Sequence, residues 1–280
     1  MENGAKVNAM DELGRSILRL AAKNNEHVDI LKYLEENGAE VNAIDKWSTI
    51  ALRFAAMNGH IDIVKDLVEN GAEVNAKNEG STSALHLAAW SGHIDIVKYL
   101  VEIGAEMNAK NQLGRSALQL AAKKEHVDIV KYLVKNGADI NAKDKGSTSA
   151  LHLAAWSGHI DIVKYLVENG AEMNAKNELG RSALQLAVKK GHVFHIVKYL
   201  VKNGADINAK DKWSTSALQF AAMNGHVDIV KYFVKNGAEV NAKNKLGRSA
   251  LQLAAKRWHA DIVKYLVKNG ADINAKDKFG

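Results

Sequence analysis

The sequence predicts an all-α solenoid, in which antiparallel helix pairs stack on one another and extended β-turn loops join successive pairs. The first observation is a fixed period: one Gly-Ala dipeptide returns every 33 residues, or in two cases after 34. Such a period indicates supersecondary units that bury a continuous core only by stacking. The second observation is that each period holds two short segments whose apolar residues recur three or four positions apart, as on one face of a helix. The glycines of the period are Gly4, Gly38, Gly71, Gly104, Gly137, Gly170, Gly204, Gly237 and Gly270.

The period divides the chain into eight complete units, with part of a unit at each end. Because a stacked array grows by adding units, we expect residues 1–280 to form a single domain. The partial units are residues 1–10 and 277–280. The complete units are 11–44, 45–77, 78–110, 111–143, 144–176, 177–210, 211–243 and 244–276.

The unit at 78–110 shows how each element is expected to form. Ser83 is a good N-cap for a short first helix over 84–89, because its hydroxyl accepts an orphan backbone N–H. Residues 91–93 make a turn, and a second helix runs from Ile94 to about Ile103. Its acidic residue Asp95 lies in the first turn, where the helix dipole favours an anion. Gly104 follows as the left-handed residue that ends the helix, and residues 105–111 lead across to the next unit.

These units resemble the ankyrin repeat. The resemblance is carried by a Gly-His-x-Asp-Ile-Val segment before the second helix and by an Asn-Gly-Ala-Asp-Ile-Asn-Ala-Lys-Asp segment after it. It covers almost all of residues 3–280. The family's Thr-Pro-Leu-His segment reads Ser-Ala-Leu-His or Ser-Ala-Leu-Gln; its proline is absent throughout, and its histidine is kept only at His86 and His152. The resemblance implies an ankyrin-repeat solenoid without enzymatic activity that binds a partner protein or peptide in its concave groove.

Two kinds of unit alternate along most of the chain. One opens with Leu-Gly-Arg-Ser, as at 113–116, and the other with Ser-Thr after Gly or Trp, as at 80–82. Residues 80–124 and 146–190 differ at only three positions, which points to recent duplication of a two-unit block or to deliberate design. Three units are irregular. The first has one extra residue between its helices, at 23–26, and in the second Ile50 replaces the N-cap serine, which predicts a weaker helix start. The insertion within 192–196 predicts a bulged turn, where Phe194 is expected to pack on the neighbouring unit; a contact site is the alternative.

Composition narrows the class of protein. No apolar run is long enough to span a membrane, and the N-terminus lacks the features of a secretory signal. The absence of cysteine excludes disulfides and zinc–thiolate sites and fits a cytoplasmic, intracellular protein, although a designed or secreted chain could have the same composition. The formal charge of +6 favours acidic partners mildly and falls short of a nucleic-acid-binding signature. We therefore expect neither nucleic acid nor a membrane as partner.

The sequence gives no indication of catalysis. Eight of the eleven histidines occupy the same turn between helices, one per unit, where each imidazole is expected to satisfy backbone groups. A metal ladder along these histidines is the alternative, but single ligands one repeat apart cannot converge on one ion. Known catalytic and phosphate-binding motifs are missing. The expectation is a protein that is not an enzyme and has no metal or cofactor.

Two sets of positions vary more than stacking requires and are the candidate binding residues. They lie just after the Ala-Ala of the first helix and in the turn before that helix, and the resemblance places both on the concave groove. Their Trp, Met and Arg residues are typical of interfaces, and an acidic partner with apolar anchors would suit them. The alternative is that the aromatic rings are half-buried between first helices. The candidates are Trp47, Met57, Trp90, Arg115, Lys123, Lys124, Trp156, Arg181, Lys189, Lys190, Trp213, Met223 and Arg248.

Other roles for such an array are structural. Because the chain starts and stops within a unit, it could be a spring-like segment of a longer array, as in a channel, toxin or bacterial effector, or a designed scaffold without a natural partner. Neither terminal unit has an evident polar cap, so end-to-end self-stacking between molecules is a further hypothesis.

Overall fold

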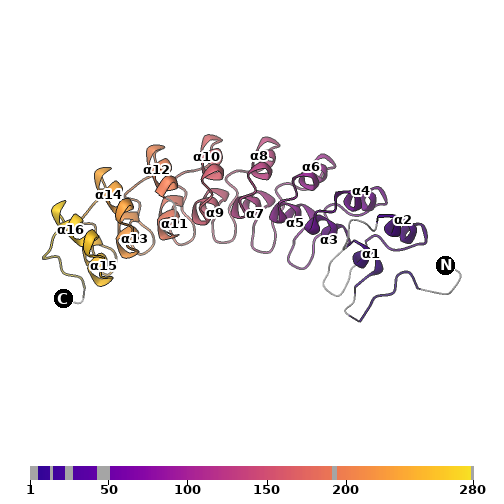
Figure 1. Ribbon diagram of the computed structural model, residues 1–280, viewed down its shortest axis with the longest axis horizontal. Coiled ribbons are helices and arrows are strands. Elements are labelled where there is room, and N and C mark those ends of the chain that lie inside the picture. The colour runs from indigo at the N-terminus through magenta and orange to yellow at the C-terminus, as the bar shows by residue number, and fades with distance from the viewer. Residues whose placement is uncertain (1–5, 13–14, 23–27, 43–50, 191–193, 279–280) are drawn as a thin grey trace. The chain divides into compact units, whose positions relative to one another are not determined.

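A computed structural model describes residues 6–12, 15–22, 28–42, 51–190 and 194–278. The described residues form sixteen α-helices in eight consecutive pairs (Figure 1), which confirms the all-α fold class. Odd-numbered helices are the first helices of their units and even-numbered helices the second. The helices are α1 (Ile17–Ala21), α2 (Val28–Glu36), α3 (Ala51–Asn58), α4 (Ile61–Glu69), α5 (Ala84–Ser91), α6 (Ile94–Glu102), α7 (Ala117–Lys123), α8 (Val127–Lys135), α9 (Ala150–Ser157), α10 (Ile160–Glu168), α11 (Ala183–Lys190), α12 (Phe194–Lys202), α13 (Ala217–Met223), α14 (Val227–Lys235), α15 (Ala250–Lys256) and α16 (Ala260–Lys268).

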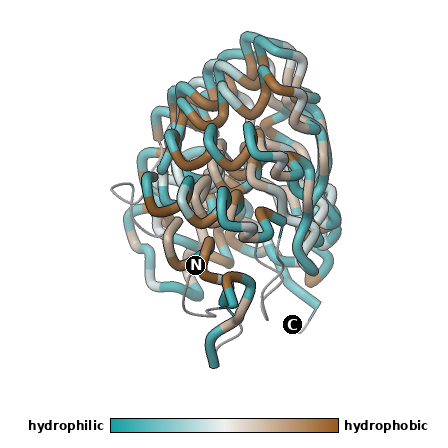
Figure 2. Tube along the Cα trace, turned by 90° about the vertical axis from the view of Figure 1, so that its right-hand side faces the viewer, coloured by the Kyte–Doolittle hydropathy of each residue, from teal (hydrophilic) through white to brown (hydrophobic). Residues whose placement is uncertain are grey.

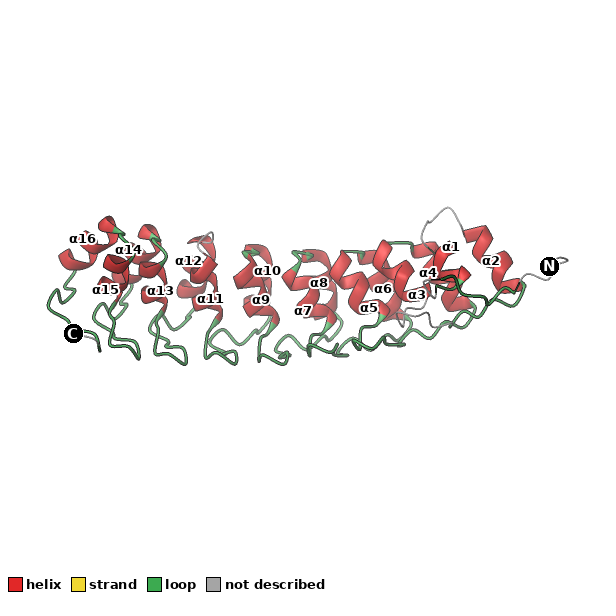
Figure 3. Cartoon of the chain, turned by 90° about the horizontal axis from the view of Figure 1, so that it is seen from below, coloured by secondary structure: helices red, strands yellow, loops and turns green. Residues whose placement is uncertain are grey.

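The chain divides into two compact parts, Met1–Lys145 and Gly146–Gly280, each built in the same way. Within each part, first helices pack on first helices, as α3 on α5 and α9 on α11, while second helices pack on second helices, as α4 on α6 and α10 on α12. The two rows are visible in Figure 1, and Figure 3 shows the connecting loops projecting to one side of them. Isolated antiparallel bridges at the turns join Met10 with Ser16 and Lys210 with Ser216.

The helices form where the sequence places caps and apolar stripes. Helix α5 begins after Ser83 as expected but continues two residues past Ala89, to Ser91. Helix α6 matches its expected range, with Ile96, Val97 and Leu100 buried. In Figure 2, brown and teal segments alternate along the helical trace, as expected when each helix buries one face. The first helices contribute small residues such as Ala88 and Ala89, both fully buried, so neighbouring first helices approach closely.

In several units a histidine or glutamine at the third position of the first helix joins the unit to the next. In α5, His86 Nδ1 accepts from the Ser83 N–H (3.3 Å), and its Nε2 donates to the carbonyls of Ala109 (3.0 Å) and Arg115 (3.1 Å). Glutamine replaces this histidine without loss of the pattern. Gln219 accepts from the Ser216 N–H through Oε1 (2.8 Å) and donates to the carbonyls of Ala242 and Arg248, both at 2.9 Å. Histidine and glutamine therefore serve as equivalent bridges between units.

The irregular units are described only in part. The extra residue at 23–26, Ile50 and residues 192–193 of the insertion lie outside the described residues. The prediction for Phe194 is confirmed: its ring meets the Tyr232 ring of the following unit edge to face, with the centroids 5.8 Å apart. Lys198 Nζ lies 4.4 Å from the centroid of the Phe194 ring on its own helix. The phenylalanine thus packs between neighbouring second helices.

Glycine is favoured at two turns of the unit for different reasons. Gly92 has φ of +90°, and a Cβ added there would lie 2.6 Å from Cε1 of the His126 ring in the next unit. Gly104 has nearly the same φ, +91°, but a Cβ there would meet nothing within 4 Å. Gly59 and Gly225 repeat the first situation, beneath His93 and His259. At Gly92, both the left-handed backbone conformation and the close contact with the next unit favour glycine. At Gly104, the backbone conformation alone favours glycine.

Substituting these two glycines separates the two effects. We expect Gly104→Ala to lower the free energy of unfolding by about 1 kcal/mol, the cost of a left-handed alanine. Gly92→Ala adds a clash with an ordered ring, so its cost should reach about 3 kcal/mol. Urea denaturation followed by circular dichroism measures both, and equal costs for the two variants would contradict close stacking of His126 on Gly92.

Candidate functional site

The first group of candidate residues lies at the C-terminal ends of first helices. Trp90 is the penultimate residue of α5, and Trp156 occupies the same place in α9. Left-handed Gly92 and Gly158 end these helices. Both tryptophans are half-buried, as is Met223 of α13, while Met57 of α3 is 40% exposed. Each ring therefore packs partly on the array and keeps part of its surface accessible.

Histidines from the following units hold these helix ends in place. His93 Nε2 donates to the carbonyl of Met57 (3.0 Å), and His126 Nε2 donates to the carbonyl of Trp90 (3.0 Å). His259 does the same for Met223 at 3.2 Å. These three imidazoles satisfy backbone groups as expected, but the groups belong to the preceding unit and not to the turn of the histidine itself. Within the described part of the chain, no three histidine or acidic side chains gather as metal ligands would.

Lysines of the next unit lie over the tryptophan rings. Lys124 Nζ is 4.0 Å and Lys123 Nζ 5.5 Å from the centroid of the Trp90 ring. Lys189 Nζ is 5.6 Å from the centroid of Trp156, and the side chain of Lys190 lies outside the described residues. Ammonium groups at these distances attract the negative face of an indole. The structure therefore joins residues that the sequence separates by a full unit into a cationic and aromatic cluster, and it does so once in each part of the chain.

The second group of candidates lies in the turns before the first helices, and its arginines pair within the chain. The Nε atoms of Arg115, Arg181 and Arg248 donate to Oδ2 of an aspartate at the start of the next unit. The aspartates are Asp144 (3.0 Å), Asp211 (3.2 Å) and Asp277 (2.9 Å), respectively. Arg181 and Asp211 are the most buried of these pairs, with side chains 13% and 1% exposed. These arginines therefore clamp successive units together.

The aspartate that pairs with the arginine also closes its own turn, and asparagine closes the turn where no such arginine precedes it. Asp211 Oδ1 accepts from the N–H groups of Trp213 and Thr215, both at 2.9 Å, and so closes its own turn. Asn111 closes the equivalent turn with its single amide oxygen, accepting from Leu113 and Arg115. From residue 45 onward, aspartate stands where the preceding unit supplies an arginine, and asparagine stands where it does not. Asp11 instead pairs with Arg15 of its own turn. Sequence reasoning missed these aspartates, although the choice between Asp and Asn tracks the arginine of the preceding unit.

Arg181 also organises the aromatic residues of the following unit. Its guanidinium carbon lies 5.3 Å from the centroid of Trp213 and 5.2 Å from the centroid of Phe220. Trp213 remains 48% exposed. Trp47, which precedes the same Ser-Thr pair in an earlier unit, lies outside the described residues. Arg181, itself paired with Asp211, thus holds the Trp213 ring in place, and about half of the tryptophan remains exposed to solvent.

The arginine clamp makes a prediction about stability. Replacing Arg181 leaves the buried Asp211 carboxylate without its partner, so Arg181→Gln should lower the free energy of unfolding by about 3 kcal/mol. The exposed Arg257 provides a matched control, and Arg257→Gln should change stability by less than about 0.5 kcal/mol. Thermal and urea unfolding of the two variants measures the difference. A cost for Arg181→Gln as small as that of the control would mean that the pair is not a clamp.

The two groups of candidates lie at opposite ends of the first helices. Helix α5 has eight residues, so its ends are about 12 Å apart at 1.5 Å per residue. Trp90 and Trp156 are at the C-terminal end, and Arg115, Arg181 and Trp213 are in turns before the N-terminal end. Within each part of the chain, the candidates therefore form two strips, a helix-end strip and a turn strip, rather than one cluster.

Several exposed apolar residues are not among the candidates. Leu113, Leu179 and Leu246 are 57%, 41% and 44% exposed in the same turns as the arginines. Trp258 is 92% exposed and has φ of +61° at the position that Gly92 and Gly225 take in their units. The leucines repeat with the Leu-Gly-Arg-Ser segment, so the sequence alone marks them as part of the turn pattern. Trp258 belongs to the variable positions that follow the Ala-Ala of the first helix.

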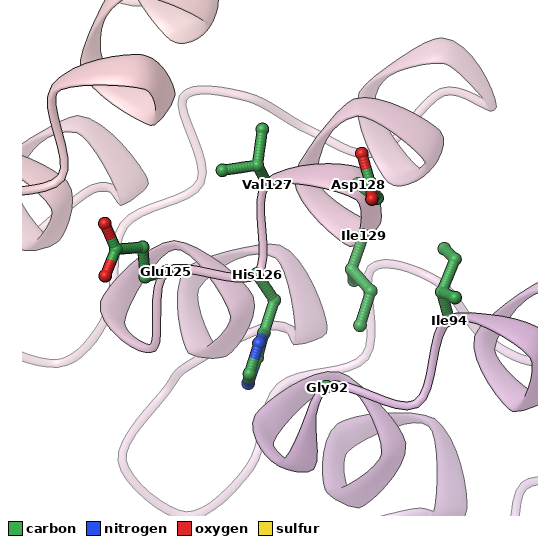
Figure 4. A pocket seen from close by; sticks show the side chains of 7 residues that line it. All are labelled: Gly92, Ile94, Glu125, His126, Val127, Asp128 and Ile129. Carbon is green, nitrogen blue, oxygen red and sulfur yellow. The ribbon is translucent and has the colours of Figure 1, made fainter.

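A shallow pocket lies at the turn between the helices of two units (Figure 4). It has a volume of ≈ 360 Å³ and is lined by Gly92, Ile94, Glu125, His126, Val127, Asp128 and Ile129. The only imidazole in its wall, that of His126, already donates to the Trp90 carbonyl. The other polar side chains that line it are carboxylates. The pocket therefore reflects how units stack.

His86 is a buried titratable group in the first-helix row. Its side chain uses both ring nitrogens, accepting at Nδ1 and donating at Nε2, which requires the neutral form. Burial lowers the pKa of His86 from its ordinary value, while its bonds to the carbonyls of Arg115 and Ala109 oppose this effect. A histidine with a lowered folded-state pKa binds its proton more readily after unfolding. Its contribution to stability is therefore present above the ordinary histidine pKa and is lost as the pH falls.

Glutamine, the chain's own replacement for this histidine, tests the effect. We expect His86→Gln to keep the bridging bonds and to lose less stability than the wild type between about pH 7.5 and pH 5. His86→Ala removes the same titrating group and leaves its backbone partners unpaired, so it should cost about 3 kcal/mol at neutral pH. Unfolding midpoints across this pH range provide the measurement. Parallel profiles for wild type and His86→Gln would show that His86 does not titrate on unfolding.

Comparison with known families identifies the repeat. The family model described as ankyrin repeats (three copies) matches residues 1–78, 18–111, 85–177, 145–211 and 184–277, which together cover nearly the whole chain. No curated protein sequence matches the chain. None of the described helices combines the length and apolarity needed to cross a bilayer.

Proposed function

Because the chain belongs to the ankyrin-repeat family, whose repeats generally mediate protein–protein interactions, we propose that it is a non-enzymatic scaffold that binds a partner protein or peptide in its groove. The partner class that fits best is an acidic segment with apolar anchors. The observation that carries the proposal is the cluster of Trp90 with Lys123 and Lys124, which recurs as Trp156 with Lys189.

The chemistry of this cluster supports an acidic and partly apolar partner. An indole that is half-buried and fixed by its neighbours loses little freedom on binding, and tryptophan often dominates interface energies. The lysines beside the indole attract carboxylates of a partner. The attraction between the ammonium groups and the indole ring keeps these lysines next to the ring. The partner would place an apolar side chain on the ring and an acidic one near the ammonium groups.

The turn strip supports the proposal in a different way. Its arginines are paired with aspartates, so their main effect is to fix the turns rather than to reach a partner. The turns are also tied directly to one another: the Lys145 N–H donates to the Leu113 carbonyl (3.0 Å), and the Lys245 N–H donates to the Trp213 carbonyl (2.9 Å). Leu113 and Trp213 would then be the contacting residues of this strip, with Arg115, Arg181 and Arg248 as positioning residues.

Selection of peptides followed by substitution tests the proposal. A random peptide library displayed on phage should yield binders enriched in Asp and Glu around an aromatic or aliphatic residue. For the best synthetic peptide, Trp90→Ala combined with Trp156→Ala should weaken binding by about 30-fold, or ~2 kcal/mol, in calorimetry. The loss arises because both proposed anchor platforms are removed.

The control removes an exposed aromatic residue from the other row of helices. Tyr33 of α2 is 56% exposed, and Tyr33→Ala should leave the affinity unchanged. Circular dichroism confirms that each variant is folded. Unchanged affinity in the folded tryptophan double variant would reject these residues as the site, and enrichment of basic peptides would reject the partner class.

A further inference from the structure

Glu35 and Asp66 are two departures from the pattern that the chain sets for its own second helices. The other seven units carry valine at the position of Glu35. All seven tyrosines of the chain occupy the position of Asp66 in the remaining units. The two acidic residues lie in adjacent units, on α2 and α4, which pack on each other. Two exceptional residues of the same charge therefore meet at a single interface.

The contact between the two carboxyl groups is largely withdrawn from solvent. The side chain of Asp66 is only 7% exposed. Glu35 Oε2 accepts from Asn70 Nδ2 at 2.6 Å, and Asp66 Oδ1 lies 3.9 Å from Lys32 Nζ. The two remaining oxygens, Glu35 Oε1 and Asp66 Oδ2, are buried and have no hydrogen-bond donor among the described residues. Since both are acceptors when ionised, a proton on one carboxyl group would let it donate to the other.

The electrostatic surroundings favour such a proton. Burial, followed by the charge and hydrogen bond of Asp66, raises the pKa of Glu35 from 4.5 to about 7. Burial also raises the pKa of Asp66, against the opposing effect of Lys32. Besides the pair itself, Lys32 on α2 and Glu69 on α4 act on these carboxyl groups. The neighbouring helices α1, α3 and α6 carry Arg19, Arg53 and Tyr99, respectively. Lys32 is the cation that acts on both carboxyl groups, and it lies at the outer limit of ion-pair distance from Asp66.

We propose that Glu35 and Asp66 form a proton-operated latch, in which one shared proton holds α2 of the first unit against α4 of the second. Loss of that proton leaves two carboxylates facing each other at a buried interface. The first unit then opens from the array while the following units remain stacked. The position of the pair at a single interface confines the response to that unit.

The direction of the pH dependence follows from the two states of Glu35. In the closed state it ionises near pH 7, whereas in the opened state it ionises near its ordinary value of 4.5. The closed state therefore holds more protons between these values, and its stability falls as the pH rises through this window. Above the window both states are ionised and the dependence ends. This sign is opposite to that of the His86 contribution.

Hydrogen exchange read by mass spectrometry tests the latch in the full chain. The protection of amides in α2 is compared with that in α6 of the same molecule, after correction for intrinsic exchange rates. From about pH 5.5 to pH 8, the protection of α2 relative to α6 should fall about tenfold. This factor is smaller than the full pKa shift of Glu35 would give, because Glu35 is partly exposed and solvent screens its charge. Protection of α2 that stays in constant proportion to that of α6 would overturn the proposal.

Two variants connect the response to the pair itself. Glu35→Gln removes the titration with little change of shape, and Glu35→Val with Asp66→Tyr restores the residues of the other units. Both should keep α2 protected at pH 8, and a pH-dependent loss that persists in either variant would refute the latch. Wild type measured at pH 8 with EDTA or with calcium chloride completes the test. Equal protection of α2 in both solutions supports a latch closed by a proton. Protection of α2 that recovers only in calcium chloride would mean that a bound cation, and not a proton, closes the contact.

Discussion

The structure depends on the satisfaction of buried polar groups by the next unit along the chain. A short helix pair cannot bury its own apolar face, so each unit must stack, and stacking encloses the backbone at the start of every first helix. Gln185 shows the solution: its amide accepts from the Ser182 N–H and donates to the carbonyls of Ala209 and Thr215 in the following connection. Because an unpaired buried amide costs about 1–3 kcal/mol, this bridge fixes how one unit sits on the next.

The same constraint positions the candidate site. The imidazole of His126 lies on Gly92 and donates to the Trp90 carbonyl, so the turn of one unit sets the helix end of the unit before it. Lys123 and Lys124 then come over the Trp90 ring as a consequence of stacking. The proposed binding surface and the stability of the array are therefore coupled. A substitution in the turn of one unit would act on the platform of its neighbour.

Departures from the repeat have local consequences because each unit contacts only its neighbours. Glu35 and Asp66 replace a valine and a tyrosine at one interface and create a buried acidic contact there, while the equivalent rows elsewhere keep their apolar and aromatic residues. Phe194 replaces an aliphatic residue and gains an aromatic contact with Tyr232. A one-dimensional array can thus change one interface without altering the fold of the others.

The sequence by itself determined the helix pairs, their caps and the residues that face the core. These depend on interactions between residues close along the chain, such as Ser83 with the first turn of α5, and on a period repeated eight times. Only the tertiary structure decided which residues meet across units. It paired Arg181 with Asp211, placed Lys124 over Trp90, and brought Glu35 to Asp66, because these contacts join residues about 30 or more positions apart. Composition of a single unit could not distinguish an arginine available to a partner from one held by the next unit's aspartate, since that difference arises from stacking.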